Sequence, residues 1–259
     1  MNPATVRKAQ AFAALHESGC FVMPNAWDAG SARLLADCGF AAIGTTSAGL
    51  AWALGVKDGA TGRDIVLENA RAIADAVDIP VSADLINGFG AAPETVAETI
   101  RLAGEAGLAG ASIEDTTGDP SQPLFDRGLA KERIAAAVEA ARGMDRPFML
   151  CARAEGLFAD ASGLNDVLAR LALYEQAGAD LLYAPALMTI ADVRAVISAV
   201  SAPVNVLAGI GNEGDVADFA ALGARRISVG SKLYSVLAAH LRAAAGELRE
   251  SGTFAWSAP

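Results

Sequence analysis

The sequence has few of the side chains that most often carry out nucleophilic or covalent catalysis. Its 259 residues include only two histidines, three cysteines and four lysines. His16 and His240 lie near the two ends of the chain, in segments that we expect to be terminal helices with exposed or interface histidines. No Ser-His-Asp or Cys-His system is therefore expected at the mouth of the barrel predicted below. The four lysines all lie outside the expected strands, which disfavours an aldolase with a Schiff-base lysine on a strand. They are Lys8, Lys57, Lys131 and Lys232.

Cysteines and long apolar runs are also scarce. Cys20, Cys38 and Cys151 are too few for a disulfide framework, and Cys151 lies in the middle of an expected strand, as a core residue would. The first ten residues lack the apolar core of a signal peptide, and no apolar run approaches the roughly 18–20 residues of a membrane span. We therefore expect a cytoplasmic protein with no membrane partner.

Basic residues are outnumbered, since 20 Lys and Arg face 30 Asp and Glu and give a net charge of −10. Nucleic-acid binding relies on a surface rich in Lys and Arg that neutralises phosphates. The composition therefore argues against a nucleic-acid partner. An anionic small-molecule substrate is still allowed, because the field inside a site can differ from the net charge.

Strand-like runs rich in Val, Ile, Phe and Ala alternate with amphipathic helical segments along the whole chain. The expected strands are 20–24, 41–46, 80–84, 110–114, 148–153, 181–186, 203–208 and 226–230. Repeated β–α units with nearly continuous apolar strands predict a parallel sheet covered by helices. Eight such units in about 250 residues predict an α/β protein with the (β/α)8 TIM-barrel fold, as a single domain over residues 1–259.

The expected turns agree with this reading. A glycine follows the last turn of four expected helices, in Cys38-Gly-Phe, Ala106-Gly-Leu, Ala177-Gly-Ala and Leu222-Gly-Ala. There it can take the left-handed conformation that ends a helix. We also expect an extra helix before the first strand, at about 3–17, and a final helix at about 232–249.

Four charged side chains are expected where a strand ends and a loop begins: Asp58, Asp84, Glu114 and Arg153. The carboxyl ends of the strands form the catalytic face of an α/β barrel. Carboxylates brought together there repel each other and call for a cation or a shared proton. With an arginine nearby, the pattern predicts a magnesium site with an anionic substrate.

Each of these residues also has a structural interpretation. Asp84 could cap the next turn, and Glu114 could pair with a basic residue on a neighbouring helix. Arg153 could form a salt bridge with Glu155, two residues on, instead of stabilising a carboxylate and a developing enolate. The long segment from Asp115 to Arg127 is expected to be a lid, or else an ordered surface loop.

Glycine-rich turns after the last two strands leave a second class of enzyme open. Gly209-Ile-Gly-Asn and Val229-Gly-Ser are similar to the phosphate-binding loops of many barrels. A phosphate-binding isomerase or aldolase is therefore an alternative.

Several segments, taken in order, resemble the isocitrate lyase/phosphoenolpyruvate mutase superfamily over residues of about 10 to 240. They are Pro24-Asn-Ala-Trp-Asp-Ala-Gly-Ser-Ala-Arg-Leu, Thr45-Thr-Ser-Ala-Gly-Leu, Leu54-Gly-Val-Lys-Asp-Gly, Ser82-Ala-Asp-Leu-Ile-Asn-Gly-Phe-Gly, Ile113-Glu-Asp and Ala152-Arg-Ala-Glu. The resemblance implies a barrel whose eighth helix is exchanged with another subunit, in a homodimer or homotetramer. It also implies Mg²⁺, with Mn²⁺ as a substitute, and chemistry next to the carbonyl of a 2-oxo acid.

The same resemblance assigns roles to the residues that match. Asp84 is similar to the direct metal ligand, while Asp58 and Glu114 are similar to groups that hold metal-bound waters. Ser47 and Ala48 are similar to the loop that binds the carboxylate of the oxo acid. Arg153 is similar to the residue that steadies substrate and enolate, so Arg153, Asp58 and Glu114 are the expected catalytic residues.

The positions at which the sequence departs from the family pattern narrow the range of expected substrates. Ile86 stands where many members have a second acidic residue, two positions after the metal aspartate. Thr116-Thr-Gly-Asp replaces the loop that carries the general-acid cysteine of the isocitrate and methylisocitrate lyases, and Ala184-Pro-Ala-Leu has no glutamate after the sixth strand. Isocitrate and methylisocitrate are therefore disfavoured as substrates. The segment 115–127 also lacks the asparagine that phosphoenolpyruvate mutases place in their lid.

These observations predict a Mg²⁺-dependent lyase that cleaves a C–C bond next to the carbonyl of a small 2-oxo or 2-hydroxy acid through an enolate. A mutase or hydrolase acting on the P–C bond of phosphonopyruvate is the first alternative. A binding protein for 2-oxo acids that has lost activity is another, because Ile86 weakens the case for the metal.

Overall fold

A computed structural model of the protein describes residues 2–257 and contains one sheet of nine parallel strands. The strands run in the order β1-β9-β8-β7-β6-β5-β4-β3-β2. The two outermost strands, β1 and β2, are separated only by Pro24 in the chain, so they are two halves of one strand and the sheet closes into a barrel. The barrel predicted from the sequence is confirmed, with its first strand divided at the proline.

The strands are short and correspond to the eight expected ones. Their bounds are β1 (Phe21–Met23), β2 (Asn25–Ala26), β3 (Ile43–Thr45), β4 (Val81–Asp84), β5 (Gly110–Glu114), β6 (Met149–Arg153), β7 (Leu181–Tyr183), β8 (Val204–Leu207) and β9 (Arg226–Ser228).

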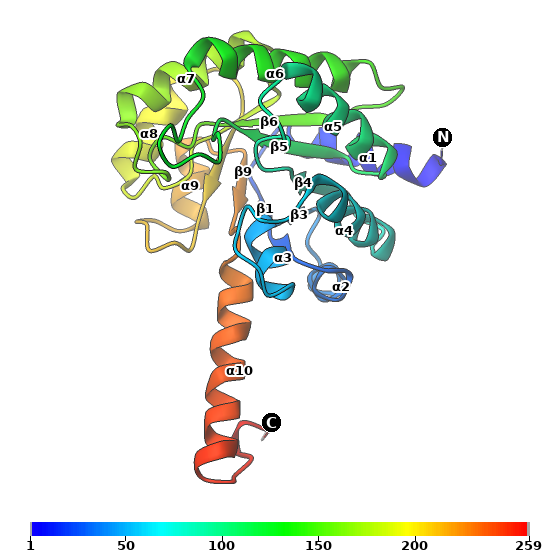
Figure 1. Cartoon of the computed structure of the whole chain (residues 1–259), viewed down its shortest axis with the longest axis vertical. Helices are drawn as coiled ribbons and strands as arrows, with labels where there is room; N and C mark the ends of the chain where they lie inside the picture. The colour runs from blue at the N-terminus through cyan, green and yellow to red at the C-terminus, as the bar shows by residue number, and fades with distance from the viewer. Residues whose placement is uncertain (1, 258–259) are drawn as a thin grey trace.

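Helices alternate with the strands and cover the outside of the barrel (Figure 1). They are α1 (Pro3–Leu15), α2 (Ala29–Asp37), α3 (Ser47–Ala53), α4 (Arg63–Ala76), α5 (Pro93–Glu105), α6 (Arg127–Arg142), α7 (Leu164–Gln176), α8 (Ile190–Ala199), α9 (Val216–Leu222) and α10 (Lys232–Glu250), followed by the 3₁₀ turn η1 (Ala255–Ser257).

The helices form where the sequence supplies one apolar face and a suitable end. In α4, for example, Val66, Ala70 and Ile73 follow helical spacing and are buried against the barrel. The four glycines expected to end helices all have positive φ angles, between 85° and 99°. They are Gly39, Gly107, Gly178 and Gly223. The expected helix ends are therefore confirmed.

The extra N-terminal helix, α1, packs across the amino-terminal ends of the strands. Its Phe12 is fully buried and forms a small core cluster with Met23 and Ala109. His16, at the end of α1, is also buried, with its ring against Phe12 and Phe21. The expectation of an exposed or interface position for His16 was wrong, because this helix covers the end of the barrel of its own chain. Burial lowers the pKa of His16 to about 4, so this histidine is neutral at pH 7.

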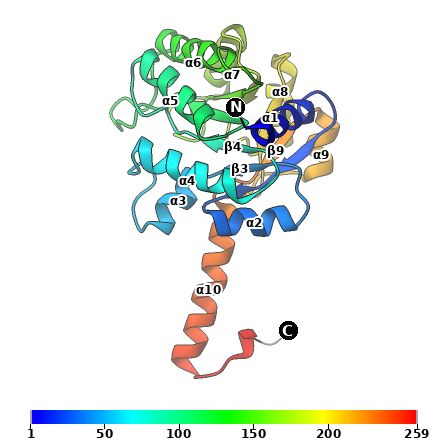
Figure 2. The same cartoon turned by 90° about the vertical axis from the view of Figure 1, so that its right-hand side faces the viewer.

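The C-terminal helix α10 projects away from the barrel in two perpendicular views (Figures 1 and 2). Only its first turns touch the body, where Tyr234 packs its ring against Trp27 and Trp52. None of the 19 residues of α10 is buried, although Leu237 and Leu241 lie on its apolar stripe. The eighth helical position around the barrel is therefore not filled by α10 of the same chain.

Among the described residues 2–257, no helix is both long enough and apolar enough to cross a bilayer.

Candidate active site

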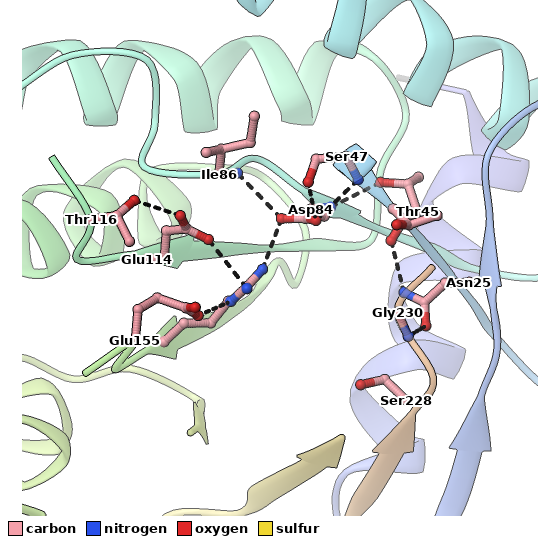
Figure 3. Close-up of polar contacts among 12 residues, drawn as sticks. Asn25, Thr45, Ser47, Asp84, Ile86, Glu114, Thr116, Glu155, Ser228 and Gly230 are labelled. Atoms are coloured by element: carbon pink, nitrogen blue, oxygen red, sulfur yellow. Dashed lines mark hydrogen bonds and ion pairs between the residues drawn. The ribbon is translucent and has the colours of Figure 1, made fainter. Parts of the chain in front are cut away.

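Three neighbouring strands each end in a charged residue at the same rim of the barrel. Asp84 is the last residue of β4, Glu114 of β5 and Arg153 of β6. Because the strands are parallel and adjacent in the sheet, their carboxyl ends lie next to each other. Figure 3 shows the Asp84 and Glu114 side chains converging on one guanidinium. The structure thus brings together three of the four charged residues singled out from the sequence.

All three nitrogens of the Arg153 guanidinium are paired with carboxylates. Nη1 lies 3.0 Å from an oxygen of Asp84, Nη2 lies 3.2 Å from one of Glu114, and Nε lies 2.8 Å from one of Glu155. The Tyr183 ring lies beneath it, 5.0 Å from Cζ. The salt bridge to Glu155, considered above as an alternative, therefore exists together with the contacts to the two strand-end acids.

The cluster carries more negative than positive charge. Three carboxylates share one guanidinium, which would leave two uncompensated negative charges if every acid were ionised. Burial raises the pKa of Glu155 to about 8; Arg153 opposes this shift, while the charge of Glu114 adds to it. Burial also raises the pKa of Glu114, and Asp84 contributes in the same direction. Such a cluster is stable only if it holds a proton or gains a further cation.

Asp84 is held by the backbone and side chains of the preceding βα unit. The N–H and hydroxyl of Ser47, the first residue of α3, donate to the second oxygen of Asp84 at 3.1 and 2.9 Å. The N–H of Asp84 donates to the hydroxyl of Thr45 at 2.9 Å. Asp84 therefore does more than cap the turn that follows it, because its carboxylate receives hydrogen bonds from α3 and Arg153 as well as from the N–H of Ile86.

Ile86 contributes to the site through its backbone. It has a positive φ of 52°, which is unusual for a β-branched residue. In this conformation its N–H donates to Asp84 at 3.3 Å and its carbonyl accepts from the N–H of Glu114 at 2.9 Å. Ile86 therefore links the ends of β4 and β5 even though its side chain has no carboxylate (Figure 3).

Asp58 does not follow a strand, so its expected position was wrong. It lies in an exposed turn between α3 and α4, because the chain forms an extra short helix after β3. Its carboxyl group still faces the same cavity, where desolvation and the nearby Asp84 raise its pKa. Ser47 opposes this rise in the pKa of Asp58, and Ala48 lines the cavity beside Ser47.

These residues line a cavity of about 690 Å³ that opens at the carboxyl ends of the strands. Its wall also includes residues that the sequence interpretation did not select as site residues: Asn25, Trp52, Tyr183, Asn205, Arg226, Ser228 and Lys232. Lys232, the first residue of α10, could have been found from its position just after the last strand. Arg226 and Asn205 lie within short strands, where a polar residue gives no clear signal in sequence.

The segment 115–127 is an ordered loop beside Glu114. Thr116 and Leu124 form an isolated antiparallel bridge, and the Thr116 hydroxyl donates to Glu114 at 2.6 Å. Asp115, at the base of the loop, is buried and accepts from Arg170 and Tyr174. The loop thus has more regular structure than its glycine and prolines indicate, and its closure over a ligand stays a prediction.

The turn after β9 has its amide groups already engaged. The N–H groups of Val229 and Gly230 both donate to the side-chain oxygen of Asn25, at 3.0 and 2.9 Å (Figure 3). A phosphate would need these amides to be free, so the contacts count against a phosphate-binding loop at this turn.

Among residues 2–257, no group of three His, Cys, Asp or Glu side chains is arranged to enclose a metal ion. Asp84, Asp58 and Glu114 instead offer hard oxygen donors around one side of the cavity. This arrangement suits Mg²⁺, which usually keeps several waters and binds one or two carboxylates.

Comparison with known proteins identifies relatives over nearly the whole chain. The model of the family described as phosphoenolpyruvate phosphomutase matches residues 12–249. The 2-methylisocitrate lyase of Escherichia coli K12 is 32% identical over 87% of this chain and 79% of its own. The probable 2-methylisocitrate lyase 2 of Corynebacterium glutamicum is also 32% identical, over 70% of this chain but only 60% of its own length. An oxaloacetate decarboxylase of Paraburkholderia xenovorans is 29% identical over 95% of this chain and 83% of its own.

Solved structures give the same relationship. A candidate lyase/mutase of Burkholderia cenocepacia J2315 is 48% identical and superposes with a TM-score of 0.96, over 100% of this chain and 94% of that one. A phosphonopyruvate hydrolase in complex with oxalate and Mg²⁺ is 28% identical, with a TM-score of 0.87 over 96% of this chain and 89% of that one.

We predict that Arg153→Met destabilises the protein by about 3–5 kcal/mol at pH 8, because it leaves buried carboxylates without their guanidinium. Their pKa values in the folded state then rise further above the values near 4 of the unfolded chain. The folded state binds more protons than the unfolded state between these values, so stability increases as the pH falls. Urea unfolding should therefore show a smaller loss at pH 5.5 than at pH 8.

Arg101→Met is the matched control, since Arg101 pairs with Glu98 on the surface of α5. It should change stability little at either pH. An equal loss at both pH values in Arg153→Met would contradict the charge imbalance of the cluster.

Proposed function

The chain belongs to the phosphoenolpyruvate phosphomutase family of the isocitrate lyase/phosphoenolpyruvate mutase superfamily, and from this membership we propose that it is a Mg²⁺-dependent C–C lyase. Its homologues are lyases and mutases of this superfamily. The proposed substrate is a small 2-oxo or 2-hydroxy acid, cleaved next to its carbonyl. The observation that carries the proposal is the cluster of three carboxylates around Arg153, which lines a cavity of about 690 Å³.

The residues present fit a magnesium ion. Asp84 would be the direct ligand, and Asp58 and Glu114 would hold its waters. The excess negative charge of the cluster and the oxygen-only donors support this assignment. When bound, the ion would supply Lewis-acid stabilisation of the enolate oxygen. A phosphonopyruvate hydrolase of the family was solved with Mg²⁺ and oxalate, which supports the choice of metal.

Arg153 would steady the substrate carboxylate and the developing enolate. Its guanidinium is fixed by three acids and the Tyr183 ring, so little reorganisation is needed when charge develops in the substrate. Ser47 and Ala48, at the start of α3, would bind the carboxylate of the oxo acid. Both residues lie beside Asp84, which supports a substrate carboxylate bound next to the proposed metal ligand.

The same arrangement supports cleavage of a P–C bond as a second candidate. Phosphonopyruvate hydrolase shares the fold at 28% identity. Cleavage of a C–C bond and cleavage of a P–C bond would both leave negative charge on the oxo-acid fragment. A panel of 2-oxo and 2-hydroxy diacids, assayed for release of a 2-oxo acid or CO₂, tests the lyase. Phosphonopyruvate, assayed for inorganic phosphate, tests the second candidate. Binding of oxalate without binding of Mg²⁺ and without turnover would instead indicate a binding protein.

We predict that Asp84→Ala weakens Mg²⁺ binding by about 100-fold or more and abolishes turnover, because it removes the proposed direct ligand. The fold should persist, since Arg153 keeps Glu114 and Glu155 as partners and the cluster loses an excess negative charge. Calorimetric titration with MgCl₂, followed by thermal unfolding, measures both effects.

Asp64→Ala is the matched control, because the Asp64 side chain is 95% exposed on α4, away from the cavity. Its Mg²⁺ affinity should equal that of the wild type. Undiminished Mg²⁺ binding by Asp84→Ala would refute the metal assignment.

We propose that α10 is exchanged between two subunits, which makes a homodimer or homotetramer. The helix carries an exposed apolar stripe that includes Val236, Leu237 and Leu241, and Trp256 beyond it is 52% exposed. Exposed apolar surface of this extent is unusual for a chain that remains alone. Exchange would cover this stripe with the open helical position of a second barrel and would close a two-fold assembly.

The assembly gives a prediction for the α10 stripe. The wild type should exceed the 26.3 kDa of one chain in light scattering at micromolar concentration. The double variant Leu237→Glu, Leu241→Glu should yield monomers or aggregates, because burying the glutamate charges between α10 and the second barrel is unfavourable. Ala239→Glu, on the opposite side of α10, should leave the mass unchanged. A wild-type mass of one chain would refute the exchange.

A further inference from the structure

Four polar or aromatic residues form a continuous row across the inside of the barrel. Arg153 on β6 is in register with Tyr183 on β7, Tyr183 with Asn205 on β8, and Asn205 with Arg226 on β9. Arg153 is the last residue of its strand, whereas Arg226 is the first of its own. The tilt of strands in a barrel therefore carries this row from the mouth at Arg153 to a deeper level at Arg226.

Arg226 is a buried cation without an acidic partner. It is only 3% exposed, and among residues 2–257 no carboxylate forms an ion pair with it. Its Nε donates to the Asn205 side-chain oxygen at 2.8 Å, and the other groups that perturb it are Cys151, Tyr183 and Arg153. Burial lowers its pKa. An arginine that the fold buries at this cost, with no counter-charge, is suited to binding an anion.

Neutral hydrogen-bonding groups surround the deep end of the cavity. Asn205 donates to the hydroxyl of Ser228 at 2.9 Å, and Ser228 faces the space between β9 and the strand-end carboxylates (Figure 3). Arg226, Asn205 and Ser228 line the same cavity of about 690 Å³ as Asp84 and Arg153. The two arginines therefore face the same cavity, one at its mouth and one at its deep end.

We propose that Arg226, Asn205 and Ser228 form a second anion-binding subsite for a distal carboxylate of the substrate. The inference rests on the proposed function, which places the oxo-acid end at Asp84 and Arg153. It narrows the substrate to a dicarboxylic 2-oxo or 2-hydroxy acid. The guanidinium and the two neutral side chains match a carboxylate in charge and in hydrogen bonding.

Matched ligands test the subsite in the wild type. With Mg²⁺ present, 2-oxoglutarate should bind at least 10-fold more tightly than 2-oxopentanoate, which has the same length but one carboxylate. Likewise, 2-hydroxybutanedioate should bind more tightly than 2-hydroxybutanoate. Oxalate, which has no carboxylate beyond the oxo-acid end that it mimics, reports on the first subsite alone. Calorimetric titration gives all five affinities.

Arg226→Met should abolish the preference for diacids and leave the affinity for oxalate within about twofold of the wild type. Without ligand, this variant should be at least as stable as the wild type, because an uncompensated buried charge is gone. Arg225→Met is the matched control: Arg225 bonds the carbonyl of Gly19 at the outside of the barrel, so its loss should keep the preference.

The outcomes separate the two proposals. Equal binding of diacids and monoacids by the wild type, or no binding of diacids, would overturn the second subsite even if oxalate binds and the proposed function stands. If the wild type does not bind oxalate, the result would count against the proposed function. A preference for diacids that depends on Arg226 would still support the subsite. A purely structural Arg226 would appear as a less stable Arg226→Met that keeps the preference.

Discussion

The site depends on one guanidinium that is shared by three carboxylates. Each acid arrives from a different position in the barrel: Asp84 and Glu114 from the ends of β4 and β5, and Glu155 from just beyond β6. Arg153 fixes their relative positions, and their excess charge makes the rim attractive to a cation. The parallel register of three short strands is therefore both a structural and an electrostatic requirement, because a shift of one residue would turn these side chains out of the site.

Ile86 shows how the chain keeps this geometry without an acid at position 86. A carboxylate at this position would add another negative charge to a cluster that already has too many. Instead, the backbone of the isoleucine, in its strained conformation, connects the two strand ends: its N–H donates to Asp84 and its carbonyl accepts from the N–H of Glu114. Behind this turn, the buried Arg133 donates to the carbonyls of Asn87, Gly90 and Ala91, so the loop after β4 is fixed from outside as well.

The sequence predicts the barrel and its three strand-end residues because both follow from local patterns. Asp84, Glu114 and Arg153 each close an apolar run, and parallel topology brings such ends together. The prediction that Asp58 ends a strand was wrong because the short helix α3 has too few residues to show a helical period. Arg226 could not be recognised from the sequence, since an arginine in a three-residue strand faces inward or outward with equal plausibility until the register is known.

The N-terminal helix has a kinetic consequence. Phe12 and its neighbours close the amino-terminal end of the barrel, and the cavity opens at the opposite rim. Entry and departure must then use the same passage. For the proposed cleavage, this geometry implies that the fragment nearer the rim leaves before the deeper one.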